Sequence, residues 1–355
     1  MKRIKYIDVL RGWAVLLMVF WHMTEALISD SIRLTSFFDI SQFIGGLVAP
    51  MFLFSSGASH SIIILKKRES FIKFTPNFRK RIIRIFQILI IAYLLHLPEN
   101  NLLEVIIRRE GSSYINFINM DVLQLIAVSL LLLQILFLII KNNKIYFYIV
   151  GIIGVITILL TPYIWQINFS DYLPVELASC LNNKTGSLFP IFPWLSYVFF
   201  GAMVMQFVME KGEENTIKKI LILGFIIILL GLVPQLLNLK STPNYDFWQT
   251  SPNIFLIKFG IVLVFLSIFY FMDKFKNYEM KYFGVFGKES LFIYVVHLLM
   301  IYGHNFYTLQ TNFGRKLNWF ELFIAYFIII IFLRYLGIYW GVIKDKFKRI
   351  RVSKA

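Results

Sequence analysis

An arginine and a histidine stand eleven residues apart in the first apolar segment of the sequence, and a glutamate follows three residues later. At about 100° per residue, eleven steps of α-helix make three turns plus roughly 20°, so Arg11 and His22 share one helix face, about 16 Å apart along the axis. Glu25 lies on that face one turn beyond His22. Ionisable side chains at membrane depth are costly and mark functional sites, so this stripe predicts a buried or water-lined site.

The three side chains suggest a division of roles. A guanidinium such as that of Arg11 holds phosphate by paired hydrogen bonds. An imidazole such as that of His22, oriented by Glu25, can act as a general base on a hydroxyl or an amine. The alternative is that Arg11 extends to lipid headgroups and that His22 only packs. Their shared face favours the functional interpretation.

Further cationic and polar residues are candidates for the same chemistry. His297 is predicted near mid-membrane, as a second catalytic histidine or as a residue that only hydrogen-bonds a neighbouring helix. Lys288 and Ser290 open that segment on the predicted cytoplasmic side, where a helix N terminus can bind an anion. Arg81 and Arg84 are one turn apart in the basic cluster 66–84, which orients the chain and can also hold phosphate groups.

Polar and aromatic residues near the predicted outer helix ends are candidates for an acceptor site, because sugars bind polar edges and aromatic faces. Their alternative roles are structural: an N-cap for Asp121 and the interfacial aromatic belt for Trp194. The histidines lack the close spacing of a zinc motif, so we expect no metal. The candidates are Trp21, Asp121, Gln124 and Trp194.

The elements that position these residues are predicted to be membrane helices. The 355 residues are 58% hydrophobic and 16% charged, whereas soluble domains carry about 25% charged residues. About ten apolar segments are long enough to cross roughly 30 Å of hydrocarbon. We therefore expect an all-α bundle that forms one membrane domain over residues 1–355. The predicted spans are 9–28, 43–65, 82–97, 121–140, 145–164, 188–209, 217–237, 254–272, 287–303 and 320–343.

The net charge of +16 follows the predicted topology. With a cytoplasmic N terminus, 25 of the 36 Lys and Arg fall on the inside, 7 fall outside and 4 lie within spans. This asymmetry predicts that both termini are cytoplasmic. Because the basic residues form short clusters between apolar runs, we expect lipid contact and no nucleic-acid partner. The chain is also compatible with a homo-oligomer.

Several motifs in the same order along the chain carry a resemblance. The arginine, ten residues and histidine of the first span resemble the first helix of the transmembrane acyltransferase superfamily. The chain is most similar to its bacterial branch of proteins like heparan-alpha-glucosaminide N-acetyltransferase. The motifs are Ile7-Asp8-Val-Leu-Arg11-Gly12, Ala49-Pro50-Met-Phe52-Leu-Phe54-Ser-Ser-Gly57, Asp121-Val-Leu-Gln124, Phe189-Pro190-Ile-Phe-Pro193-Trp194 and Gly287-Lys288-Glu-Ser290-Leu-Phe-Ile-Tyr294-Val-Val-His297.

The resemblance implies an enzyme of the bacterial cytoplasmic membrane. It would move an acyl group, usually acetyl, from cytoplasmic acyl-CoA to a carbohydrate or glycolipid on the far side. Arg11 would then belong to the donor site, and His22 would be the catalytic histidine. The animal enzymes place a key histidine in the loop after the first helix, and loop 29–42 has none, which weakens a glucosamine assignment. Direct transfer and an acyl-histidine intermediate are both compatible with these residues.

Two other classes of protein remain as alternatives. A transporter would use the intramembrane charges as a solute or proton path, but the two halves show no matching pair of charged, broken helices. A lipid-linked glycosyltransferase would need sizeable outer catalytic loops, and the predicted loops are short.

Overall fold

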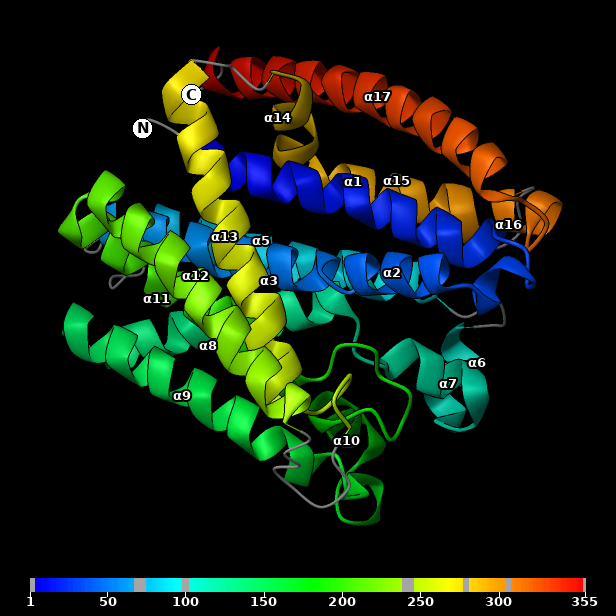
Figure 1. Cartoon of the computed structure of the whole chain (residues 1–355), viewed down its shortest axis with the longest axis horizontal. Helices are drawn as coiled ribbons and strands as arrows, with labels where there is room; N and C mark the ends of the chain where they lie inside the picture. Colours follow the sequence, from blue (N-terminus) through cyan, green and yellow to red (C-terminus); the bar gives the residue numbers. More distant parts are fainter. Residues whose placement is uncertain are drawn as a thin grey trace. The chain divides into compact units, whose positions relative to one another are not determined.

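The computed structural model describes residues 4–66, 75–97, 102–237, 246–276, 281–303 and 308–353. In these ranges the chain is helical, and the extended pairing recorded is a single isolated bridge between Ile28 and Leu317. The predicted all-α membrane bundle is confirmed (Figure 1).

Eight spans in the described ranges are long and apolar enough to cross a membrane. One of them combines α2 and α3. Two further predicted segments, 82–97 and 287–303, correspond to α5 and to the shorter α15. The helices are α1 (Lys5–Leu27), α2 (Ser36–Gly45), α3 (Val48–Lys66), α5 (Pro76–Leu95), α8 (Val122–Ile139), α9 (Asn143–Ile164), α11 (Ile191–Lys211), α12 (Glu213–Leu236), α13 (Pro252–Lys276), α15 (Ser290–Tyr302) and α17 (Trp319–Ser353).

The chain divides into two compact units, and both boundaries fall inside helices, in α3 and in α13. Unit 1 contains residues 1–51 and 268–355, and unit 2 contains residues 52–267. Unit 1 therefore joins the two ends of the chain.

In unit 1, α1 is the central helix. It packs against α14 (Lys281–Lys288), α15 and α17, and also against α2 and the short α16 (Leu309–Phe313). Figure 1 shows α15 running beside α1. Because neighbours cover several of its sides, α1 buries residues around most of its circumference, including Leu10, Val15 and Val19. A helix placed in this way can hold polar side chains away from lipid.

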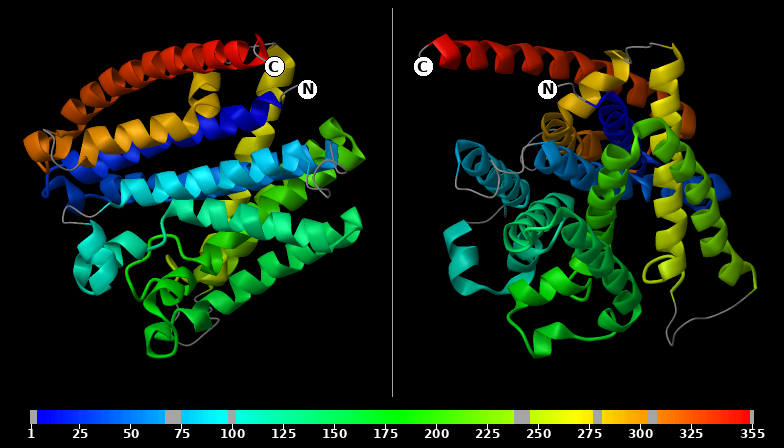
Figure 2. Two further views of the ribbon diagram at one scale, coloured as in Figure 1. Left: turned by 180° about the vertical axis from the view of Figure 1, so that it is seen from behind. Right: turned by 90° about the vertical axis from the view of Figure 1, so that its left-hand side faces the viewer.

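In unit 2, α11 packs against α8, α9 and α12, and α5 lies beside α8 (Figure 2). Glycines allow the closest approaches. A Cβ atom added at Gly57 of α3 would lie 1.8 Å from the carbonyl oxygen of Val198 in α11, and one added at Gly201 of α11 would lie 2.1 Å from that of Phe54. Small residues of this kind let membrane helices pack backbone to backbone.

The two longest predicted outer loops contain short helices. They are α6 (Leu102–Arg108), α7 (Gly111–Ile118), the 3₁₀ turn η2 (Phe169–Asp171) and α10 (Val175–Leu181). The Tyr114 hydroxyl of α7 donates to the carboxylate of Glu176 in α10. This hydrogen bond holds the pKa of Glu176 below its usual value, and the nearby Arg109 guanidinium adds to the effect. The loops are therefore folded together.

Candidate active site

The first half of α1 carries Arg11 at a close crossing with α14. A Cβ atom added at Gly287 of α14 would lie 1.9 Å from the Asp8 carbonyl oxygen, and one added at Gly12 would lie 2.5 Å from that of Phe283. Arg11 pairs with Asp8 across one turn, at 3.9 Å, with its side chain 18% exposed. A largely buried guanidinium at a helix crossing is suited to hold an anionic group.

Asp8 lies inside the first turn of α1, since the N-cap residue is Ile4 and its side chain makes no cap hydrogen bond. Aspartate often caps a helix at its N terminus, but Asp8 lies one turn beyond the N-cap position. The carboxylate instead pairs with Arg11, while still lying near the positive end of the helix dipole.

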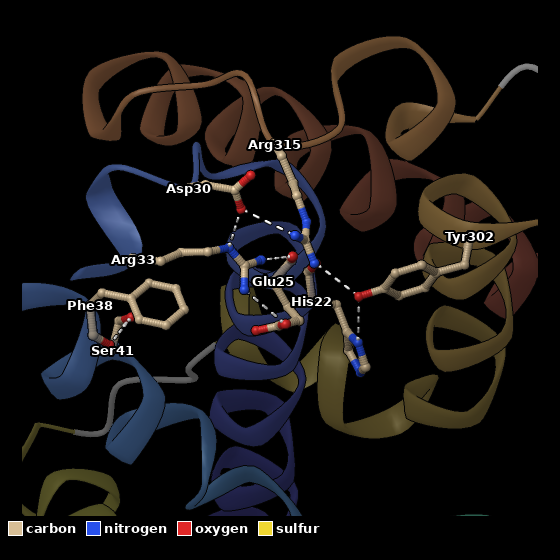
Figure 3. Close-up of polar contacts among 8 residues, drawn as sticks. All are labelled: His22, Glu25, Asp30, Arg33, Phe38, Ser41, Tyr302 and Arg315. Atoms are coloured by element: carbon tan, nitrogen blue, oxygen red, sulfur yellow. Dashed lines mark hydrogen bonds and ion pairs between the residues drawn. The ribbon is translucent and has the colours of Figure 1, made fainter. Parts of the chain in front are cut away.

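His22 contacts two aromatic rings of α15. Its Nδ1 lies 3.3 Å from the Tyr302 hydroxyl, and the same hydroxyl donates to the His22 carbonyl oxygen at 3.0 Å (Figure 3). The His22 and His297 ring centroids are 5.2 Å apart. Since α1 is an unbroken helix from Lys5 to Leu27, the predicted register between Arg11 and His22 is kept.

His297 is fully buried against His22. Its Nδ1 hydrogen-bonds the Ile293 carbonyl oxygen at 3.0 Å, one turn earlier in α15. Its Nε2 is enclosed and makes no hydrogen bond to the residues that the structure describes. A buried acceptor of this kind costs free energy unless a ligand or water satisfies it, so it marks the two-histidine pair as a functional candidate.

Glu25 belongs to a network of ion pairs one turn beyond His22. Its carboxylate accepts from Arg33 at 3.1 Å, and Arg33 also donates to the Glu25 carbonyl oxygen. Asp30 lies 3.9 Å from Arg33 and 3.1 Å from Arg315 (Figure 3). From the sequence, Glu25 is expected to orient the His22 ring. In the structure the Tyr302 hydroxyl contacts His22 Nδ1.

The end of α1 is fixed by main-chain hydrogen bonds to the segment before α17. The amides of Arg315, Lys316 and Leu317 donate to the carbonyl oxygens of Ala26 and Leu27, at 2.9 to 3.2 Å. The Ser29 amide returns a bond to Leu317. This clasp holds the chain immediately beyond His22 and Glu25.

The remaining candidates of unit 1 lie in different surroundings. The Trp21 ring packs on α2, where a Cβ atom at Gly45 would lie 2.4 Å from it. Lys288 is exposed at the end of α14, and Ser290 begins α15. The residue between them, Glu289, forms an ion pair with Lys344 of α17. The predicted anion site at the start of α15 therefore already has a carboxylate beside it.

In unit 2 the structure separates the two arginines that the sequence pairs. Arg84 is exposed, whereas the Arg81 guanidinium reaches into the bundle and hydrogen-bonds His60 Nδ1. The other ring nitrogen of His60 lies 3.3 Å from the Tyr146 hydroxyl, which donates to the Leu133 carbonyl oxygen. Residues 67–74 of the basic cluster lie outside the described residues.

The predicted acceptor residues of unit 2 differ in the contacts that they make in the structure. Asp121 caps α8 by accepting from the Val122 amide at 2.6 Å, and its second oxygen lies 3.6 Å from His96 Nε2. Gln124 is 3% exposed, and its amide makes no hydrogen bond to the described residues. Trp194 packs edge to face with Phe189. The Asp121 cap is confirmed, and the substrate roles stay predictions.

The geometry of unit 1 is that of a base held by a second residue. His22 is the reactive candidate, Tyr302 is its hydrogen-bonding partner, and His297 packs against its ring. Tyr302 is not among the residues predicted from the sequence, because 280 residues separate it from His22 and no spacing rule links them. No group of three or more metal-ligating side chains occurs among the described residues.

The sequence profile of a family described as heparan-alpha-glucosaminide N-acetyltransferase, catalytic, matches residues 3–232. The match contains α1 with Arg11 and His22, whereas His297 and Tyr302 lie beyond it. No curated protein matches the chain significantly.

Proposed function

The chain belongs to the heparan-alpha-glucosaminide N-acetyltransferase catalytic family, and from this premise we propose that it transfers an acyl group from acyl-CoA to an extracytoplasmic carbohydrate. Membership makes it a multi-pass membrane protein of an acetyltransferase family. Acetyl-CoA as the donor is part of the proposal. The finer parts of the proposal are the acceptor, a hydroxyl or amine of a sugar or glycolipid, and the bacterial cytoplasmic membrane as location.

The observation that supports the reaction is the placement of His22. It lies on the same continuous helix as Arg11, about 16 Å farther along the axis, with its ring held by Tyr302. That length suits a donor whose phosphates are held near Arg11 and whose extended pantetheine arm reaches the imidazole. Arg81 is the weaker donor candidate, since its guanidinium already hydrogen-bonds His60.

The proposed step is a direct acyl transfer with His22 as general base. The acceptor oxygen or nitrogen attacks the thioester carbonyl carbon while its proton passes to His22. The carbon–sulfur bond then breaks, and the departing thiolate of CoA takes that proton from the imidazolium. His297 is fully buried beside the His22 ring, so water is kept from that side of the base, which protects the thioester from hydrolysis.

The test uses the purified full chain in nanodiscs with radiolabelled acetyl-CoA and a panel of sugars and amino sugars. We expect label in an acylated sugar. His22→Asn should lower kcat by about 10²- to 10⁴-fold, the usual contribution of a general base. A His22→Asn protein that unfolds at the wild-type temperature and keeps wild-type kcat would refute the assignment. In proteoliposomes, uptake of labelled solute without an acylated product would favour a transporter instead.

A further inference from the structure

The Tyr302 hydroxyl makes two contacts with the same residue. It lies 3.0 Å from the His22 carbonyl oxygen and 3.3 Å from His22 Nδ1 (Figure 3). A phenol has one proton to donate and lone pairs with which to accept, whereas a carbonyl oxygen only accepts. The shorter contact therefore takes the hydroxyl proton, and the hydroxyl oxygen is left to accept from Nδ1.

A neutral imidazole carries one N–H, so a proton on Nδ1 leaves the lone pair on Nε2. From this geometry we infer that Tyr302 is a positioning residue that fixes the Nδ1–H tautomer of His22 and makes Nε2 the base. The role of Nε2 as the base rests on the proposed function, whereas the assignment of the Nδ1–H tautomer does not.

The arrangement serves both protonation states of the imidazole. When Nε2 takes a proton, Nδ1–H still donates to the same oxygen of Tyr302, so the hydrogen bond does not have to reorganise. A preorganised acceptor of this kind stabilises the imidazolium as charge develops on it. A ring with its proton on Nε2 would instead have no lone pair on that nitrogen with which to take the proton of the sugar substrate.

His297 leaves this assignment undisturbed. A carbonyl oxygen holds its Nδ1, so that nitrogen carries the proton and Nε2 carries the lone pair. In each of the two rings Nε2 carries a lone pair and no proton, so neither ring can donate a hydrogen bond to the other through Nε2. The His297 ring, whose centroid lies 5.2 Å from that of His22, therefore donates no hydrogen bond to Nε2 of His22.

The structure offers a matched control for Tyr302. Tyr326 of α17 also donates its hydroxyl proton to a carbonyl oxygen of α1, that of Leu16, at 3.3 Å. Tyr326→Phe thus removes the same kind of bond between a tyrosine and the same helix. It leaves the His22 ring contact in place.

The direct measurement is the tautomer of His22 in the wild-type protein. The full chain, labelled with ¹⁵N at its five histidines, is reconstituted in nanodiscs, and His22→Asn identifies the resonances of His22. We expect an Nδ1–H tautomer in the wild type and in Tyr326→Phe, and a shift toward Nε2–H in Tyr302→Phe. An Nε2–H tautomer of His22 in the wild type would overturn the inference, and this result does not depend on the folding of Tyr302→Phe.

The kinetic measurement separates positioning from folding. Tyr302→Phe should lower kcat by about 10- to 100-fold, the usual cost of losing a residue that orients a functional histidine, and leave KM for acetyl-CoA unchanged. Tyr326→Phe should keep the wild-type kcat. Equal kcat in the two variants would overturn the positioning role. A tautomer shift in a protein that acylates nothing would uphold the tautomer assignment and reject the proposed reaction.

Discussion

Replacement of one glycine at the crossing of α1 and α14 should disable the site from a distance. A Cβ atom at Gly287 would lie 1.9 Å from the Asp8 carbonyl oxygen, and an ordinary contact begins at 3.4 Å. In Gly287→Ala the two helices must therefore separate by roughly 1.5 Å, the difference between these distances. Main-chain atoms lie on both sides of the contact, so no side-chain rotation relieves it.

This separation reaches the histidines through the chain. α14 ends at Lys288, and α15, which carries His297 and Tyr302, begins two residues later. A misplacement of 1 Å can cost about 10²-fold in rate, and overpacking typically costs about 1–3 kcal/mol of stability. We expect Gly287→Ala to lose about 10²-fold in kcat for acyl transfer and to unfold at a lower temperature.

The control lies in the same helix, where a Cβ atom at Gly284 meets nothing within 4 Å. Gly284→Ala makes the same chemical change and gains up to about 1 kcal/mol of helix propensity, so its kcat and melting temperature should not fall. If both variants retain wild-type kcat in the nanodisc assay, the close crossing does not position the site and the reasoning is refuted.

Two further predictions concern unit 2. Tyr114→Phe removes the hydrogen bond that lowers the pKa of Glu176, so this pKa should rise toward its ordinary 4.5. A lowered carboxylate pKa stabilises the folded state above the unfolded pKa, and that contribution disappears as the pH falls through the folded pKa. Hydrogen-exchange protection of α7 should therefore fall on acidification below about pH 4.5 in the wild type and change less in Tyr114→Phe; equal profiles would contradict this. Asp121→Ala should lose about 1 kcal/mol with the cap of α8, whereas Asp121→Asn keeps the cap; a higher KM for the sugar in Asp121→Asn would support the predicted substrate role, and an unchanged KM would reject it.

The parts of the fold that follow from local pattern were predictable. Long apolar runs specify membrane helices wherever they occur in the chain, and the Arg11–His22 register depends only on helix geometry. The Asp121 cap is equally local, because the residue bonds the amide of its own neighbour.

The partners of the site residues could not be predicted, because they depend on which helices meet. Tyr302 is separated from His22 by 280 residues. The ion pair of Glu25 with Arg33 forms because the chain turns back after the end of α1. Arg81 and Arg84 occupy the same short stretch of α5, but only the packed neighbours decide which one enters the bundle. A single sequence contains the candidates without their pairing.

The discontinuity of unit 1 has a consequence for biosynthesis. Its first portion ends at Met51, and its second begins at Ile268. At about 5–20 residues per second, the ribosome needs roughly 10–40 s to make the intervening stretch. During that interval a newly inserted α1 lacks its contacts with Tyr302 and with residues 315–317. Its polar face is then in contact with the translocon, with lipid or with a chaperone. Nascent chains stalled before residue 302 should accordingly expose His22 to quality-control proteases.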